Sequence, residues 1–528
     1  MGVQALEYRI TEGRSVDDVL AGLAGRWRLG EESAQPLLRT LLDTFDWAVY
    51  LDGGLLELRE AGAARHLRWQ DLTDAGRDGE LEIGGLVPGF AGDLAPGPVR
   101  DRVAAVSGVR RLLPQIVIDG RLRTLALENE DDKTVVRVQI ETHRFRDPGS
   151  GREGEIAARL RLLALRGYGE ELGEAVALVE HGLGLPQAAE PLLLEALAAA
   201  GRRPADYSSK LDYRLDPDQR ADVATKSILC GLLETLEANI PGTQANLDSE
   251  FLHDLRVATR RTRAGLTQIR GVFPDPVVDD FKARFAWLQQ VTGPVRDLDV
   301  YLLGFEGYRE GLPEPLKPHL DPLRDYLEAH YGEARSELDR ALDSPQLERL
   351  LADWRAFLEA EVPEHSPAPN AERPIKAVGD ERIWRMLRRV RREGRAITPD
   401  SPPPELHELR KSCKKLRYLM EFFQSLYPGE LIRGPIKLLK ALLDCLGGFQ
   451  DLAVQAEQLG AIAVRMHAEG GAAPDTLLAM GALVGDLYRR QAEERAGFAQ
   501  LFTELDAPDN RTLMRELFAP AKAAGERA

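Results

Sequence analysis

The chain has little cysteine and no long apolar run. Its three cysteines, Cys230, Cys413 and Cys445, lie far apart among 528 residues, and their number and spacing fit neither a disulfide framework nor a metal cluster. A reducing cytoplasm is the compartment that fits this usage best. The first residues carry no apolar signal-peptide core, and no stretch approaches the roughly 18 uninterrupted apolar residues of a membrane span. We therefore expect a soluble cytoplasmic protein with no membrane partner.

An excess of positive charge is also missing. The sequence holds 69 Lys and Arg against 85 Asp and Glu, which leaves a formal net charge of -16. This balance disfavours a globally basic nucleic-acid binder, so a site for a polyanion must be a local basic surface on an acidic body. The apolar content of 44% is typical of globular proteins, and the length suits two to four domains.

One basic stretch is present twice. Residues 253–263 return as residues 407–417, with a histidine, an acid, a leucine and four basic positions in the same order, 154 residues later. The match continues without an insertion, so that Gly447 and Asp451 correspond to Gly293 and Asp297. A register kept over more than forty residues indicates one supersecondary unit used twice.

The spacing within each copy predicts a ridge of cations on one helix. At 100° per residue, positions 253, 256, 260 and 263 fall within roughly 80° of one helix face, and like charges at such spacings repel each other. A single basic run is usually a solvated face, but its duplication favours a polyanion site. For Lys437 and Lys440 the two alternatives, a part of the site or a solvent-facing position, are equally open. The predicted binding residues are His253, Arg256, Arg260, Arg261, Arg263, Arg296, His407, Arg410, Lys411, Lys414, Lys415, Arg417, Lys437 and Lys440.

The order of patterns along the chain predicts a mixed α/β part followed by an all-helical part. Before residue 190 we expect a strand at 6–10, a helix at 15–29, a hairpin at 50–59 around Gly53, and two strands within 121–141. After a linker at 201–217, apolar residues at helical spacing predict helices at 219–239, 248–272, 277–291, 297–310 and 320–342. The prolines at 402–404 start the second basic helix. Gly293 and Gly447 are expected to end helices, and Asp297 and Asp451 to begin the next ones as caps or partners of a cation.

The first part resembles a CYTH domain, the triphosphate tunnel family. The resemblance rests on Glu7 and Arg9 in the first strand, on residues 42–46, and on 166–168, and it spans most of residues 1–195. It implies an antiparallel β-tunnel whose inward side chains hold a triphosphate and divalent metals. The family opens with Glu-x-Glu-x-Lys, whereas this chain has Ala5 and Arg9 at the outer positions, so one metal-binding carboxylate is missing. A sheet with one solvated polar face is the alternative. The candidate tunnel residues are Glu7, Arg9, Arg59, Arg121, Arg123, Arg137 and Glu141.

The second part resembles the CHAD family over about residues 215–510, because both copies carry both motifs in order. The resemblance implies an all-α domain of two four-helix bundles related by a pseudo-twofold axis, with the basic helices facing a central channel for inorganic polyphosphate. CYTH followed by CHAD is a known pairing in that family. The second copy departs at Gln450, where the first has Arg296. We predict a multidomain α+β chain with a degenerate CYTH-like domain at 1–200, the linker at 201–217, and a CHAD domain at 218–510 with repeats at 218–360 and 375–510.

These features favour a non-catalytic protein that binds inorganic polyphosphate and is recruited to polyphosphate granules in the cytoplasm. Binding needs converging Arg and Lys donors but no cofactor and no catalytic residue, and it should strengthen as pH falls through the imidazole range. No metal site is expected, because Lys411 stands where a zinc motif begun by His407 would need a second histidine. The alternative is an inorganic triphosphatase or polyphosphate-processing hydrolase that uses the tunnel with Mg or Mn. Nucleic acid ranks last, since no aromatic residues interleave the basic positions.

Overall fold

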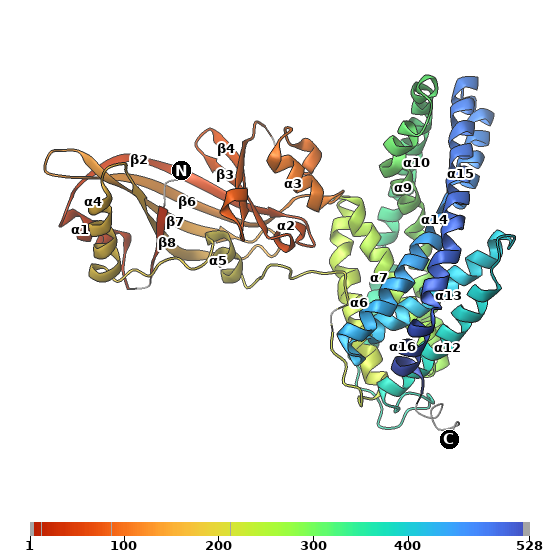
Figure 1. Ribbon diagram of the computed structural model, residues 1–528. Helices are drawn as coiled ribbons and strands as arrows, with labels where there is room; N and C mark the ends of the chain where they lie inside the picture. The colour runs from red at the N-terminus through yellow and green to blue at the C-terminus, as the bar shows by residue number, and fades with distance from the viewer. Residues whose placement is uncertain (1–4, 12, 86, 212, 521–528) are drawn as a thin grey trace. The chain divides into compact units, whose positions relative to one another are not determined.

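The computed structural model describes residues 5–11, 13–85, 87–211 and 213–520, which form two compact units (Figure 1). Unit 1 comprises residues 1–208 and unit 2 comprises residues 209–528. The boundary between them lies inside the segment 201–217 that the sequence predicts as a linker. None of the described helices combines the length and the apolarity that a membrane crossing requires.

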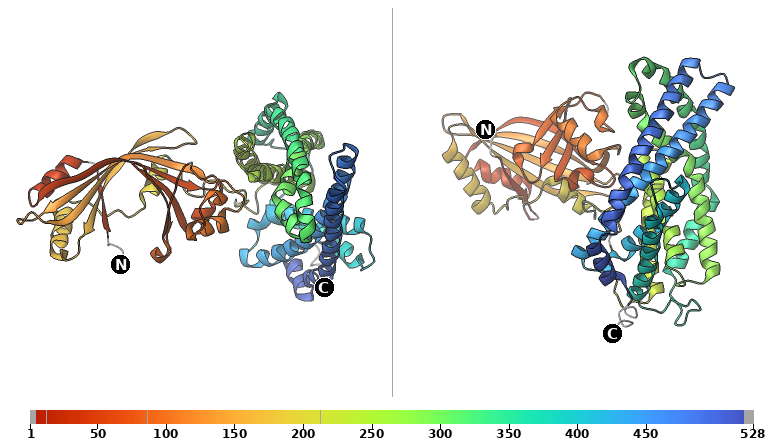
Figure 2. Two further views of the ribbon diagram at one scale, coloured as in Figure 1. Left: turned by 90° about the horizontal axis from the view of Figure 1, so that it is seen from above. Right: turned by 45° about the vertical axis from the view of Figure 1, so that its right-hand side comes forward.

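Unit 1 is built on one antiparallel sheet of eight strands, as the sequence predicts for a tunnel-like α+β domain. The strand order is β1-β8-β7-β6-β2-β3-β4-β5, and Figure 2 shows the sheet curving along its width. The long strands in its middle come from alternating apolar and charged residues. The strands are β1 (Ala5–Ile10), β2 (Arg28–Asp43), β3 (Gly54–Ala61), β4 (Ala64–Asp71), β5 (Gly79–Glu82), β6 (Leu113–Glu128), β7 (Thr134–Arg146) and β8 (Glu153–Ala164).

Short helices cover the two faces of this sheet. On one face, α1 (Val16–Ala24) and α4 (Gly169–Ala177) bury Tyr8, Val138 and Leu160 in a common core. On the opposite face, α5 (Leu192–Ala199) packs over one end of the sheet with Ile118 and Phe145. The helices α2 (Ala48–Leu51) and α3 (Pro98–Ser107) lie beside β3 and β4. The remaining part of the second face carries charged side chains.

The hairpin predicted at 50–59 is wrong. Residues 48–51 form the helical turn α2, because the buried carboxylate of Asp43 accepts hydrogen bonds from the backbone N–H groups of Val49 and Tyr50, both at 2.9 Å. Strand β3 begins only at Gly54, and the reversal into β4 is at Gly62, whose φ of 61° suits glycine. The Asp-Gly-Gly sequence predicts a hairpin turn, but the hydrogen bonds to Asp43, earlier in the chain, favour a helical turn instead.

Unit 2 is all helix, and its two halves repeat the same plan. Helices α6 and α7 of the first half correspond to α12 and α13 of the second at the offset of 154 residues, whereas α8 and α9 correspond to the single long helix α14. The helices are α6 (Ala221–Gln244), α7 (Ser249–Gln268), α8 (Asp275–Val291), α9 (Gly293–Glu310), α10 (Asp321–Leu342), α11 (Pro345–Glu359), α12 (Ile375–Ala396), α13 (Pro403–Phe423), α14 (Gly429–Ala468), α15 (Pro474–Leu505) and α16 (Pro508–Phe518).

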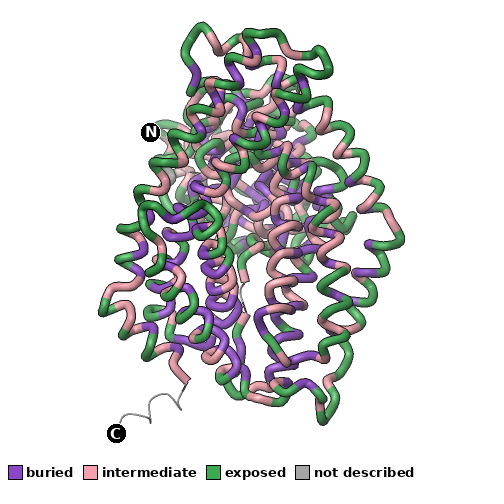
Figure 3. The backbone as a smooth tube through the Cα atoms, turned by 90° about the vertical axis from the view of Figure 1, so that its right-hand side faces the viewer, coloured by how far each residue is buried: buried purple, intermediate pink, exposed green. Residues whose placement is uncertain are grey.

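Two apolar cores join the halves of unit 2. The larger core contains residues from α6, α7, α8 and α11 together with α12, α13, α16 and the first part of α14. The smaller core is made where α9 and α10 of the first half pack against α14 and α15 of the second. Figure 3 shows the buried side of these helices turned inward and the exposed side turned out. The larger and the smaller core together hold the two halves of unit 2 as one body. The parts of α9, α10, α14 and α15 that surround the smaller core form a helical group of their own.

The helix break predicted at Gly447 is wrong. Gly447 is buried in the middle of α14, and Asp451 follows one turn later in the same helix, so neither ends or caps a helix. In the first half, Thr292 alone separates α8 from α9, which begins at Gly293, and Asp297 lies inside α9. A glycine inside a helix costs about 1 kcal/mol relative to alanine, which packing of neighbours such as Leu446 offsets.

Candidate polyanion-binding groove

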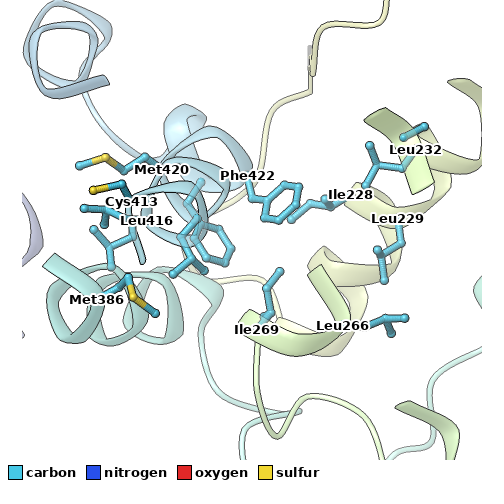
Figure 4. Close-up of a cluster of buried hydrophobic side chains, with 14 of the residues drawn as sticks. Ile228, Leu229, Leu232, Leu266, Ile269, Met386, Cys413, Leu416, Met420 and Phe422 are labelled. Carbon is cyan, nitrogen blue, oxygen red and sulfur yellow. The ribbon is translucent and has the colours of Figure 1, made fainter. Parts of the chain in front are cut away.

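The two basic helices α7 and α13 are each positioned by an apolar side. On α13, Leu409, Cys413 and Leu416 are buried in the larger core, three and four residues apart, which leaves the cationic side of the helix outward. Figure 4 shows Phe422 of α13 next to Ile228 of α6, with Leu266 and Ile269 from the end of α7 nearby. The duplicated helices therefore meet through this core.

The central cavity of unit 2 lies between α7 and α13 and has a volume of about 480 Å³. Arg260 and Arg263 from α7 face Lys411, Lys414 and Lys415 from α13, and both copies of the duplicated stretch thus contribute. Lys282 of α8 completes the lining, and no carboxylate is part of it among the described residues. Of the two predicted ridges, Arg260 and Arg263 of the first and Lys414 of the second thus line one cavity, together with Lys411 and Lys415 beside the second ridge.

Two further cavities extend the central one. A cavity of about 310 Å³ toward α14 shares Lys414 and Tyr418 with it, and a cavity of about 350 Å³ toward α12 shares Gln268 and Lys415. Because neighbouring cavities share residues, the three form one continuous surface, which we call the basic groove. The α14 cavity adds Arg410, Arg417, Asp444 and Asp451, and the α12 cavity adds Arg270, Arg382, Arg385, Arg388, Arg389 and Arg392.

Arg260 and Lys414 occupy corresponding positions in the two copies and meet in the central cavity. Neither side chain makes a hydrogen bond or an ion pair with another described residue. Burial lowers the pKa of Lys414 to about 8, and the positive charges of Arg410 and Arg260 act in the same direction. A half-buried ammonium group held among cations is a strained arrangement that an anion would relieve.

The histidines of the duplicated stretch do not line the basic groove. His407 lies with its Nδ1 3.0 Å from Oε1 of Gln450. In the first copy Arg296 takes the place of Gln450, and burial together with the charges of Arg296 and Arg260 lowers the pKa of His253. The exchange of Arg296 for Gln450 therefore gives the two histidines different surroundings. The predicted role of both in anion binding stays a prediction.

Each motif places a glycine beside an arginine of the ridge. A Cβ atom on Gly293 would lie 3.6 Å from Nη1 of Arg256, and one on Gly447 would lie 3.8 Å from Nη2 of Arg410. Arg410 Nη2 donates to Asp451 Oδ1 at 3.1 Å, and burial lowers the pKa of Arg256 to about 10. A Cβ atom at either position would make only ordinary van der Waals contact with the guanidinium group, so these distances do not by themselves require glycine.

Several predicted residues are engaged elsewhere. Arg261 donates to the carbonyl oxygen of Ser209 at 2.9 Å and to Glu421 at 3.3 Å, and Arg296 donates to the carbonyl oxygen of Ser249 at 3.2 Å. Arg261 therefore links α7 to Ser209 and to α13, and Arg296 links α9 to α7. Lys437 and Lys440 are exposed on α14 and line none of the three cavities. Their position favours the solvent-facing alternative.

The basic groove also contains residues that the sequence interpretation missed. The arginines of α12 recur at steps of three and four residues, the same spacing as in the predicted ridges, but they are not duplicated. This spacing in the sequence could have identified α12 as a further helix with a basic face. Tyr418, directly after the second basic run, lines both the central and the α14 cavity, so one aromatic ring does adjoin the cations. The missed residues are Arg270, Lys282, Arg382, Arg385, Arg388, Arg389, Arg392 and Tyr418.

In unit 1 the predicted tunnel residues divide between the two faces of the sheet. Directly paired residues of antiparallel strands share a face. Arg123 is paired with Ile140, which is buried in the core under α1 and α4, so Arg123 and Arg121 lie on that face and not with the other candidates. Pairing and alternation place a larger set on the opposite face, which we call the ionic face: Glu7, Arg9, Arg39, Glu57, Arg59, Arg137, Glu141, Arg159 and Arg161.

The carboxylates of the ionic face are already paired with arginines. Glu141 is 1% exposed and lies 3.1 Å from Arg39 and 3.3 Å from Arg161, while Glu7 lies 3.4 Å from Arg161. Although burial alone would raise it, the hydrogen bond from His143 and the charges of both arginines lower the pKa of Glu141 to about 2. Within the described residues, no three His, Cys, Asp or Glu side chains gather as possible metal ligands.

Arg59 is the exception on the ionic face. It makes no hydrogen bond or ion pair with any described residue, and burial followed by the charge of Arg39 lowers its pKa. At the other end of this face, Glu195 from α5 contacts Arg9 at 2.6 Å and also pairs with Arg159. Among the described residues, the ionic face therefore offers one unpartnered guanidinium to an anion, whereas its carboxylates Glu7 and Glu141 are ionised and already have arginine partners.

Comparison with known proteins identifies the class of unit 2. Residues 227–460 match the CHAD domain family, so the helical unit contains a CHAD domain. Among curated proteins the comparison finds no match. Among solved structures, the CHAD domain from the plant Ricinus communis is 25% identical, with a TM-score of 0.46, and the alignment covers 55% of this chain and 94% of that one.

Two other solved structures are similar at lower identity. PptA from Streptomyces chartreusis is 17% identical, with a TM-score of 0.43, and the alignment covers 54% of this chain and 100% of that one. HpAC1 from Hippeastrum, for which a dominant triphosphatase activity is described, is 13% identical, with a TM-score of 0.27 and coverage of 39% and 99%.

Proposed function

We propose that unit 2 binds inorganic polyphosphate along the basic groove. The observation that carries this proposal is the central cavity, where both copies of the duplicated stretch place cations around one space and no carboxylate of the described residues is part of the lining. A linear polyphosphate carries about one charge per phosphate and offers no base to read. Its binding therefore requires converging Arg and Lys donors, not a nucleophile or a base-reading side chain.

Unsatisfied donors support the same ligand. The Nε atoms of Arg263 and Arg410 are buried and have no acceptor among the described residues. A buried donor without a partner costs roughly 1–3 kcal/mol, and a side-chain shift that brought these Nε atoms to a phosphate oxygen would remove this cost. Since the chain has a net charge of -16, an anion would also be repelled elsewhere and drawn to this surface. Binding of this kind would recruit the protein to polyphosphate granules in the cytoplasm.

A titration with long-chain polyphosphate tests the proposal. Full-length protein is titrated in a filter-binding or gel-shift assay, and the complex is competed with DNA and with pyrophosphate. Polyphosphate should displace both competitors, and its affinity should fall steeply as salt is added, because condensed cations are released from the polyanion. Stronger binding of DNA would instead make nucleic acid the ligand, with Tyr418 as a stacking surface.

Unit 1 supports a second, weaker candidate, a phosphate site at Arg59 on the ionic face. A triphosphatase needs carboxylates free to hold Mg or Mn and to position water. Because Glu7 and Glu141 are paired with arginines, we infer that unit 1 retains anion binding without efficient hydrolysis. Phosphate release from tripolyphosphate with Mg or Mn, abolished by Glu7→Gln, would make the enzyme the correct alternative.

A further inference from the structure

The α12 end of the basic groove is not part of the duplicated stretch. Its exposed arginines Arg385, Arg388 and Arg392 correspond, 154 residues earlier on α6, to Gly231, Glu234 and Ala238. The first half of unit 2 therefore has no cation at these three places, although the two helices are equivalent in the repeat. The cations of α12 make the groove asymmetric.

The corresponding end beside α6 is also closed by the chain itself. Lys415 of the α12 cavity corresponds to Arg261, which is held by the carbonyl oxygen of Ser209 and by Glu421. Two further residues are held at this end: Gln424 donates to the carbonyl oxygen of Leu211 at 3.3 Å, and Tyr213 Oη donates to the carbonyl oxygen of Phe422 at 3.0 Å. In the other half, the position of Glu421 is taken by the uncharged Thr267.

We propose that the α12 end of the groove is a separate subsite for the distal part of a long polyphosphate chain, and that the chain is held asymmetrically because the counterpart at α6 is closed. This inference rests on the proposed function, since it takes the central cavity as the site where phosphate first binds. Pyrophosphate or tripolyphosphate fits within the central cavity, whereas only a longer chain also reaches α12. The subsite consists of Arg270, Arg382, Arg385, Arg388, Arg392 and Lys415.

One arginine of the subsite is held by a hydrogen bond within the protein, and three others have no ion-pair partner among the described residues. Arg382 is 8% exposed and donates its Nε to the carbonyl oxygen of Gln268 at 2.6 Å, at the end of α7. Arg385, Arg388 and Arg392 have no ion-pair partner among the described residues, whereas Arg389 is paired with Glu393 at 2.6 Å. At 1.5 Å per residue, Arg382 to Arg392 covers roughly 15 Å of helix. That length suits several consecutive phosphates of an extended chain.

The test compares short and long ligands on three forms of the full-length chain. The first form is the wild type, the second is R385Q/R388Q/R392Q, and the third is R340Q/R349Q/R515Q, which removes three exposed arginines of unit 2 outside the groove. Tripolyphosphate affinity is measured by calorimetry, and long-chain polyphosphate affinity by filter binding. We expect the α12 variant to lose roughly tenfold or more for the long chain and less than about twofold for tripolyphosphate, with the control unchanged for both.

The possible outcomes separate this inference from the proposed function. If the α12 variant binds the long chain as the wild type does, or loses both ligands equally, the distal subsite is wrong while central binding stands. An equal loss in the control variant would show a general charge effect and would also overturn the subsite. If the wild type binds neither ligand, the proposed function itself fails.

Discussion

Arg260 of α7 and Lys414 of α13 hold corresponding positions in two copies of one sequence, and both line the same cavity. Equivalent residues can meet only near the axis that relates the copies, so this pair marks the centre of the helical unit. The side chains of both residues lack a hydrogen-bond or ion-pair partner among the described residues. Two cations without a partner among the described residues, placed together by duplication, oppose folding, and an anionic ligand would offset this cost.

Removing the charge of Lys414 should separate these two effects. Because burial and neighbouring cations disfavour its ammonium group, Lys414→Met should raise the midpoint of thermal unfolding by roughly 2 °C while it weakens polyphosphate binding about tenfold or more. Calorimetry and filter binding measure the two quantities. Lys440→Met, at an exposed position outside the groove, is the control and should change neither. A lower midpoint in Lys414→Met would show that its charge is compensated in the free protein.

Binding should depend on pH through Lys414. With a pKa of about 8 in the free protein, this side chain is charged below pH 8, where affinity is highest, and neutral well above it. Affinity for polyphosphate should therefore fall as pH rises from about 8 to 10, and stability of the free protein should rise over the same range because the unfolded chain keeps its proton. Titrations at several pH values test this.

Lys414→Arg is the matched variant for the pH experiment, because arginine stays charged and should keep its affinity at pH 9.5. A wild-type affinity that does not change between pH 7 and 10 would contradict the assignment. A separate rise in affinity below pH 7, lost in H253Q/H407Q, would support the histidine role predicted from the sequence, even though neither ring lines the groove.

The sequence predicts those features of the fold and of the basic groove that depend on local residue spacing or on the internal repeat. The helix at 321–342 follows from its apolar spacing, and the facing ridges follow from duplication of residues 253–263. Gly447 was misjudged because a glycine often ends a helix, whereas α14 continues through it from Gly429 to Ala468. The arginines of α12 were missed because they occur in one copy only, and their contribution depends on tertiary contact with Lys415.

Neutralising Glu421 should strengthen binding. This carboxylate lies 2.6 Å from Arg417, which lines the α14 cavity, and 3.3 Å from Arg261. Glu421→Gln keeps the shape of the side chain but removes the competing charge, so affinity for polyphosphate should rise by roughly three- to tenfold, with a steeper salt dependence. Glu516→Gln, at an exposed position of α16, controls for net charge and should have little effect. Equal gains in both variants would argue against a local role of Glu421.

In unit 1, Glu141→Gln should be strongly destabilising. It removes the carboxylate that the buried Arg39 and the partly buried Arg161 share. Because each arginine keeps a second partner, Glu57 at 3.3 Å and Glu7 at 3.4 Å, we expect the lower end of the about 3–5 kcal/mol that breaking a buried pair costs. Hydrogen exchange of β7 in the full-length protein measures this loss. The control Glu32→Gln breaks the surface pair with Arg137 and should cost less than about 1 kcal/mol. Equal hydrogen exchange of β7 in the two variants would show that the ion pairs of the ionic face do not stabilise unit 1.

The pKa of Glu141 also predicts acid sensitivity of unit 1. Since it is lowered to about 2 in the folded protein, the stability that Glu141 contributes is complete above its unfolded pKa of about 4.3 and is lost as pH falls from there toward 2. Hydrogen exchange of β7 between pH 5 and pH 3 should show decreasing protection in the wild type. Protection in Glu141→Gln should change less over this range, and a parallel decrease in both would assign the effect to other carboxylates.

Reversing the charges at the centre of the groove tests the account most directly. Long-chain polyphosphate is titrated into R260E/K414E and into the control K437E/K440E, which has the same change in net charge at exposed positions of α14 outside the groove. The account predicts that R260E/K414E loses detectable binding, while K437E/K440E stays within about twofold of the wild type. Wild-type affinity in R260E/K414E would contradict it.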